Sequence, residues 1–349
     1  MEEFRLSTRI IHGEDPLAAL KELSGKRVLV VSDGFLAKEG LLNRVTKHLT
    51  DSTVEVFQEV SGEPTLRLVA KGVAALERFD AQVVVGFGGG SAMDCAKALG
   101  YCAGKRLPIW CIPTTAGTGS EVTNFAVLTN TDEGVKYPLV DPSLMPEVAI
   151  LDKRFLSGVP AAVTADTGMD VLTHAAEACV AERANAFTDA LAEKAFSLAY
   201  EKLPEAQKGD LAARGEMLFA STLAGAAFHS AGLGVCHALA HAIGGQLHVP
   251  HGRINAILLP RVIEANAVLP AAAKKYGRLS KLCGLSPNPR ALSGAIRRLN
   301  RRLGLPERLK GPLDLEKAAK DALADPCMRD NGKAFTQSEL VALLREAVS

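Results

Sequence analysis

Hydrophobic and polar positions follow different periods in the two halves of the chain. In the first half, short runs rich in β-branched residues alternate with segments whose apolar residues recur at helical spacing. The strand pattern covers residues 26–33, 54–57, 81–87, 108–113 and 147–151, and the helical pattern covers residues 66–79 and 91–99. Strands separated by helices predict a parallel, doubly wound sheet.

The pattern changes after about residue 156, where Ala and Leu recur at helical spacing and no convincing strand remains. Helices are expected at residues 166–181, 184–203, 211–230, 235–243, 253–266 and 271–282, with more after residue 291. The chain is therefore predicted to form an α/β domain over residues 1–156 and an all-helical domain over residues 157–349.

The composition limits which partners the protein is expected to bind and in which cellular compartment it is expected to lie. With 40 basic and 39 acidic residues, the net charge of +1 gives no reason to expect nucleic acid or an acidic membrane. The seven cysteines form no CxxC pair and are odd in number, which is typical of reduced thiols. The N-terminus has no long apolar run, so we expect no secretory signal. No uncharged apolar stretch reaches the length needed to span a bilayer, so we expect no membrane span and a cytoplasmic protein.

Histidine is clustered: five of the eight histidines lie between His229 and His251. On an earlier helical stretch, Asp170 and His174 are four residues apart, which places both side chains on one helix face. His237 and His241 repeat that spacing. Burying imidazoles without partners costs free energy, so this many histidines on apolar helices indicates that they share one function.

His251 lies between Pro250 and Gly252, which predicts a turn that presents the imidazole. Three imidazoles and one carboxylate suit a borderline divalent cation, Fe(II) or Zn(II). Spacing alone leaves open which three of His174, His237, His241 and His251 join Asp170. His248 is expected outside the ligand set or at the surface.

Two loops with small residues follow strands of the first domain. One is the triple glycine before a helix, made by Gly88, Gly89, Gly90 and Ser91, and the other runs from Pro113 to Glu121 and carries Thr114, Thr115 and Thr118. Glycines let the backbone approach a ligand, and the N–H groups at a helix start favour phosphate. A triple glycine is also a common tight turn, but both loops fall at strand carboxyl ends, where open α/β sheets bind ligands.

Asp33 ends the first predicted strand. A carboxylate at that position accepts hydrogen bonds from the adenosine ribose and repels a 2′-phosphate, which favours NAD over NADP. The alternative is a turn aspartate before Gly34.

These motifs resemble the iron-dependent, or group III, alcohol dehydrogenases. The matching segments are residues 88–94, 113–123, 167–174 and 232–252, in family order along the chain. A finer likeness, to the 1-propanol dehydrogenases of propanediol-utilisation microcompartments, is carried by residues 33–37, 187–194 and 244–251.

The resemblance implies a Rossmann-like nucleotide-binding domain followed by an all-helical metal-binding domain, as in the dehydroquinate synthase-like fold. It assigns the metal to Asp170, His174, His237 and His251, and it gives His241 a catalytic place near the nicotinamide. It also makes Lys136 a cofactor contact, where the alternative is a solvated loop lysine. Glu63 stands where many relatives have Asn, which leaves one cofactor contact in doubt.

The resemblance further implies an NAD(H)-linked, Fe(II)-dependent enzyme, with Zn(II) as the alternative metal, that interconverts a short-chain aldehyde such as propionaldehyde and its primary alcohol. Rival hypotheses are a zinc-dependent polyol dehydrogenase, a dehydroquinate-synthase-like lyase and a non-enzymatic metal-binding scaffold. The resemblance also implies a homo-oligomer and a place beside other microcompartment enzymes.

Overall fold

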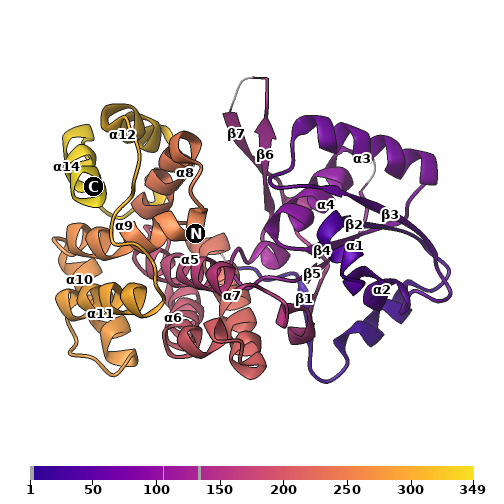
Figure 1. The fold of residues 1–349 in the computed structure, drawn as a ribbon, viewed down its shortest axis with the longest axis horizontal. Coiled ribbons are helices and arrows are strands. Elements are labelled where there is room, and N and C mark those ends of the chain that lie inside the picture. The colour runs from indigo at the N-terminus through magenta and orange to yellow at the C-terminus, as the bar shows by residue number, and fades with distance from the viewer. Residues whose placement is uncertain (1–3, 105, 133–134) are drawn as a thin grey trace. The chain divides into compact units, whose positions relative to one another are not determined.

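The computed structural model describes residues 4–104, 106–132 and 135–349, and it divides them into two compact units (Figure 1). One unit is Leu6–Gly158, and the other combines residues 4–5 with Val159–Ser349. The division falls after residue 158 rather than after residue 156. Among the described residues, no single helix is long and apolar enough to cross a membrane.

A six-stranded sheet forms the centre of the first unit, and every pairing in it is parallel. The strands, in the order β1-β8-β5-β4-β2-β3, are β1 (Arg9–His12), β8 (Val148–Leu151), β5 (Ile109–Pro113), β4 (Val83–Gly88), β2 (Arg27–Asp33) and β3 (Thr53–Val60). The parallel sheet predicted from the buried apolar runs is thereby confirmed.

Each face of the sheet has its own hydrophobic core. Along β2, Val28 and Val30 face one core while Leu29 and Val31 face the other, because side chains alternate along a strand. The first core is closed by η1 (Pro16–Leu23), α1 (Gly34–Lys38) and α2 (Leu41–Thr46), and the second by α3 (Leu66–Phe79) and α4 (Gly90–Cys102). Helices on both faces define a doubly wound architecture.

Several short elements differ from the sequence prediction. The strand β1 was not expected, and neither were α1 and α2 nor the antiparallel pair β6 (Phe125–Asn130) and β7 (Val135–Val140). The short helices η2 (Ser120–Val122), η3 (Pro142–Leu144) and η4 (Lys153–Leu156) were not expected either. β1 has four residues, too few to show a period, and β7 contains Pro138, which argues against a strand in a sequence pattern.

The second unit is helical, as predicted. Its helices are α5 (Ala161–Val180), α6 (Ala186–Gln207), α7 (Leu211–Ala231), α8 (Val235–Leu247), α9 (His251–Asn266), α10 (Pro270–Leu282), α11 (Pro289–Arg302), α12 (Leu315–Ala324), α13 (Pro326–Asp330) and α14 (Gln337–Ala347). α5 packs against α6, α7, α9 and α10 and is buried over most of its length. Polar side chains on α5 therefore require partners inside the unit.

Candidate functional site

Three helices of the second unit bring the predicted ligand residues together. Asp170 and His174 lie on α5, His237 lies on α8, and His251 is the first residue of α9. Donor atoms of Asp170, His174 and His237 all lie within 4.8 Å of one another, and all three residues are buried.

His251 lies beside the same carboxylate. Its Nε2 lies 3.7 Å from Asp170 Oδ1, the same distance that separates His237 Nε2 from that oxygen. The ring of His237 stacks on that of His174, with centroids 4.5 Å apart, and lies 5.2 Å from that of His251. The four residues assigned by the resemblance therefore form one cluster around Asp170.

The electrostatics of the cluster favour a bound cation. Burial alone would raise the pKa of Asp170, but the imidazoles of His174, His251 and His237 hold it well below its usual range. The carboxyl group is thus an anion at neutral pH. Burial, together with the neighbouring imidazoles, lowers the pKa of His251, so that its ring is neutral and offers a lone pair.

Asn255 shows where the acceptor atoms of the cluster point. This amide is fully buried one turn after His251 on α9, and its Nδ2 lies 2.7 Å from Asp170 Oδ1, 3.1 Å from His251 Nε2 and 3.4 Å from His237 Nε2. Three acceptors that converge on one donor can also converge on one cation. One carboxylate oxygen and imidazole nitrogens in this arrangement fit Fe(II) or Zn(II).

The backbone around His251 differs from the predicted turn. His251 begins a helix, and Gly252 is its second residue. A Cβ at Gly252 would lie 2.0 Å from the carbonyl oxygen of Asp166, so glycine is needed because α9 starts directly against α5. Arg253 fixes the same junction through two bonds of 3.0 and 2.9 Å to the Asp166 carboxylate.

His241 lies at the edge of the cluster and is exposed. Its ring stacks on that of His251, with centroids 5.2 Å apart, and its Nδ1 lies 2.8 Å from Asp325 Oδ2. Asp325 in turn accepts a bond from the backbone N–H of Cys327, which orients the carboxylate. His248 is exposed at the carboxyl end of α8, outside the cluster.

In the first unit, the two glycine-containing loops meet at the carboxyl ends of β4 and β5. Thr114 N–H donates to the carbonyl of Gly88 at 2.9 Å. A Cβ on Gly90 would lie 2.7 Å from Thr118 Cγ2, and one on Gly89 would lie 3.4 Å from Thr115 Oγ1. Glycine therefore lets the start of α4, with Ser91 in its first turn, approach the threonine loop closely.

A buried polar network holds the threonine loop against α4. Lys97 Nζ donates to Ser120 Oγ at 2.7 Å, to Thr123 Oγ1 at 3.1 Å and to the carbonyl of Phe125 at 3.0 Å. Ser120 Oγ donates to Asp94 at 2.6 Å. Burial lowers the pKa of Lys97 and raises that of Asp94, although each group partly offsets the shift of the other.

The structure bears differently on the predictions for Asp33 and for Lys136. Asp33 Oδ1 caps α1 by accepting from the Leu36 N–H at 2.8 Å, while Oδ2 lies 3.6 Å from the position of a Cβ on Gly88. The turn role is thus present, and the carboxylate also faces the glycine loop. Lys136 pairs with Thr129 in the β6–β7 pair, and its side chain lies outside the described residues. Glu63 accepts a bond from Thr129 Oγ1.

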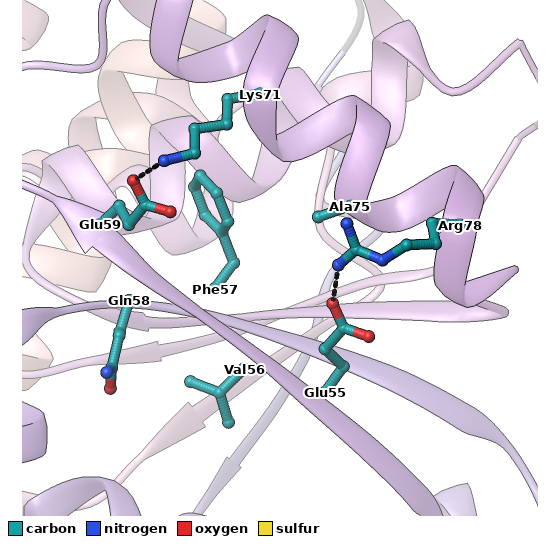
Figure 2. A pocket seen from close by; sticks show the side chains of 8 residues that line it. All are labelled: Glu55, Val56, Phe57, Gln58, Glu59, Lys71, Ala75 and Arg78. Atoms are coloured by element: carbon teal, nitrogen blue, oxygen red, sulfur yellow. Dashed lines mark hydrogen bonds and ion pairs between the residues drawn. The ribbon is translucent and has the colours of Figure 1, made fainter.

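A separate surface hollow lies between β3 and α3 and contains none of the predicted site residues (Figure 2). Its walls carry two ion pairs, Lys71 with Glu59 and Arg78 with Glu55, and in each pair the two charges cancel. We therefore assign it no role in the chemistry of the site.

Sequence reasoning missed three polar residues that contact the cluster: Glu177, Asn255 and Asp325. Glu177 follows His174 by three residues and Asn255 follows His251 by four, so helical spacing could have identified both. Asp325 is 84 residues from His241 and carries no local signal.

Comparison with known proteins identifies two family models along the chain. Residues 7–153 match the model described as iron-containing alcohol dehydrogenase, and residues 164–348 match the C-terminal model of the Fe-containing alcohol dehydrogenase family.

Individual relatives match over the full length. The chain is 45% identical to the 1-propanol dehydrogenase PduQ of Salmonella typhimurium, over 99% of this chain and 100% of the relative. A crystal structure of a 1,3-propanediol oxidoreductase superimposes with a TM-score of 0.94 at 35% identity, over 99% of this chain and 100% of the other. Sulfoacetaldehyde reductase from Bifidobacterium kashiwanohense, solved in complex with NAD+, gives a TM-score of 0.91 at 27% identity, over 100% of this chain and 99% of the other.

Proposed function

The chain belongs to the iron-containing alcohol dehydrogenase family, and from this premise we propose that it uses NAD(H) to interconvert a short-chain aldehyde, such as propionaldehyde, and its primary alcohol. One observation carries the proposal: Asp170, His174, His237 and His251 converge from three helices, with the first three buried and the partly exposed His251 at the same carboxylate. The identity of 45% to a 1-propanol dehydrogenase supports a small, unbranched substrate.

Asp170, His174, His237 and His251 would hold the metal through one carboxylate oxygen and three ring nitrogens. When bound, Fe(II) supplies Lewis acidity toward the substrate oxygen, and NAD(H) supplies or accepts the hydride. The anionic Asp170 and the neutral His251 already have the protonation states that a ligand needs.

His241 is suited to proton transfer at the edge of this site. Its Nδ1 is engaged by Asp325, which leaves Nε2 as the nitrogen that exchanges a proton with substrate or solvent. Because the ring is exposed and also stacks on His251, it can contact both the site and water. We assign it the role of general acid–base.

The glycine and threonine loops of the first unit are assigned to the dinucleotide. The start of α4 offers backbone N–H groups for a pyrophosphate, next to the hydroxyls of Thr115 and Thr118. Asp33 supports a preference for NAD, because its carboxylate lies beside Gly88 and would repel a 2′-phosphate.

The lyase alternative is less well supported. Lyases of this architecture act on phosphorylated, acidic substrates and need free basic side chains. Arg253, the basic residue next to the cluster in sequence, is held in two bonds by Asp166 and is only partly exposed.

The proposal is tested by anaerobic assay of the full chain loaded with Fe(II) or with Zn(II). Acetaldehyde, propionaldehyde and butyraldehyde are each supplied with NADH or NADPH, and cofactor oxidation is followed. We expect NADH consumption with at least one aldehyde, higher activity with Fe(II) than with Zn(II), and weaker use of NADPH. A metal-replete protein that oxidises NADH with none of the three aldehydes would contradict the proposal.

A further inference from the structure

Glu177 is a buried carboxylate that lies beside the cluster without being one of its predicted ligands. It is 1% exposed on α5, three residues after His174, and it faces the start of α8. Its two oxygens accept four hydrogen bonds: from the N–H groups of Gly234, Cys236 and His237 at 3.1, 2.6 and 3.4 Å, and from His237 Nδ1 at 2.6 Å.

The backbone bonds replace a missing helix cap. Gly234, the N-cap of α8, has no side chain, so the first N–H groups of the helix need partners from elsewhere. Three of them bond to Glu177, and the N–H of Val235 donates to Asn331 Oδ1 at 3.2 Å. A negative charge at a helix start is also favoured by the helix dipole.

Glycine at position 234 is what allows this approach. A Cβ there would lie 2.8 Å from Glu177 Oε1 and 2.6 Å from Asn331 Oδ1. The first turn of α8 is therefore pressed directly against the two side chains that cap it.

The fourth bond fixes the ring of His237. When Nδ1–H donates to Glu177, the proton is on Nδ1 and the lone pair is on Nε2, which lies 3.7 Å from Asp170 Oδ1. Because the same carboxylate holds both the backbone and the ring of His237, the direction of Nε2 is set relative to α5. Asp170, His174 and Glu177 are spaced four and three residues apart on that helix and share one face.

We propose that Glu177 is a positioning residue that sets the metal affinity of the site by fixing the tautomer and orientation of His237. The inference rests on the metal site of the proposed function. In other metalloproteins the partners of ligating histidines contribute roughly 10- to 100-fold in metal affinity. One helix thus supplies two predicted ligands and the group that aims a third.

The test compares metal affinity in the full-length native chain, Glu177→Gln and Asn331→Ser. Glu177→Gln keeps the shape of the side chain but turns an acceptor into a donor that faces N–H groups. Asn331→Ser is the matched control, because it removes the other cap of α8 without touching His237. Affinity for Co(II) is measured by competition with a chelator, and the visible Co(II) spectrum reports coordination geometry. Thermal unfolding of each metal-free variant reports the structural cost.

We expect Glu177→Gln to bind Co(II) roughly 10- to 100-fold more weakly than the native chain and to show an altered Co(II) spectrum. We expect Asn331→Ser to lose stability, while its affinity for Co(II) stays within about twofold of native. Glu177→Asp, which keeps the charge, should recover part of the loss and serves as the test if Glu177→Gln does not fold. Native affinity in Glu177→Gln, or equal weakening in Asn331→Ser at equal loss of stability, would overturn the proposal. These readouts do not depend on turnover, so an inactive but metal-binding chain would contradict the proposed reaction alone.

Discussion

Asp325 Oδ2 lies 2.8 Å from Nδ1 of His241, so an acidic side chain at the start of α13 orients the exposed imidazole of α8. The pair has the arrangement found where a carboxylate fixes which ring nitrogen carries the proton. It also connects the site with a segment far along the chain, and the first prediction follows from it.

Asp325→Asn should lower kcat roughly 10- to 100-fold while leaving metal content unchanged, because the ring of His241 loses its fixed tautomer but the ligands stay in place. Steady-state kinetics with an aldehyde and NADH, together with metal analysis, check this. Asp321→Asn, on an exposed residue paired with Lys317, is the control and should be neutral. A variant with native kcat would refute the orienting role.

His251→Ala should weaken metal binding by more than roughly 100-fold, because a ligand is removed outright rather than loosened. Binding of NADH should stay within about twofold of native, since the loops assigned to the nucleotide belong to the other unit and carry none of the metal ligands. Metal titration and NADH fluorescence measure the two quantities. His248→Asn is the control, because His248 lies outside the cluster with a φ of 51°, a conformation that Asn tolerates. A metal-replete His251→Ala protein would disprove the ligand assignment.

Asp33→Asn should shift the cofactor preference toward NADP. Asn still caps α1 through its side-chain oxygen, but the charge that repels a 2′-phosphate is gone. A charge–charge repulsion of about 1–4 kcal/mol predicts a fall on the order of tenfold or more in the ratio of kcat/KM for NADH to that for NADPH. Asp51→Asn, on the exposed loop before β3, should leave the ratio unchanged. An unaltered ratio in Asp33→Asn would assign Asp33 to the turn alone.

Lys97→Met should change how stability depends on alkaline pH. Burial lowers the pKa of Lys97 below its usual 10.5, so between the folded and unfolded values the unfolded chain binds more protons. This group therefore makes the free energy of unfolding rise with pH in that window. The difference in stability, native minus variant, should increase as the pH rises toward the usual pKa of 10.5. Urea unfolding at a series of pH values measures it, and a constant difference would show that the buried amine does not titrate there.

Much of the fold could be predicted because buried parallel strands and amphipathic helices have strong periods. The runs at β2, β4 and β5 are continuous and apolar, and the structure confirms them as strands of one parallel sheet. β1 and the β6–β7 pair escaped prediction because they are short, partly polar or interrupted by proline. Their existence depends on neighbours far along the chain.

The same distinction applies to the site. Asp170 with His174, and His237 with His241, were identified because helical spacing is local. That α5, α8 and α9 meet at one point is a tertiary fact which no local pattern contains. The homo-oligomeric state and any place among microcompartment enzymes stay predictions from the resemblance, and the cytoplasmic location stays a prediction from composition and the N-terminal sequence.

The glycine-capped starts of α4 and α8 have opposite consequences for inhibition by small anions. At α8, Glu177 already supplies the negative charge, so sulfate or phosphate in a buffer would be repelled from that end of the helix. At α4, the glycine cap brings no acid of its own to the first turn. Inorganic anions should therefore compete with the nucleotide at the start of α4 and should not bind at the start of α8.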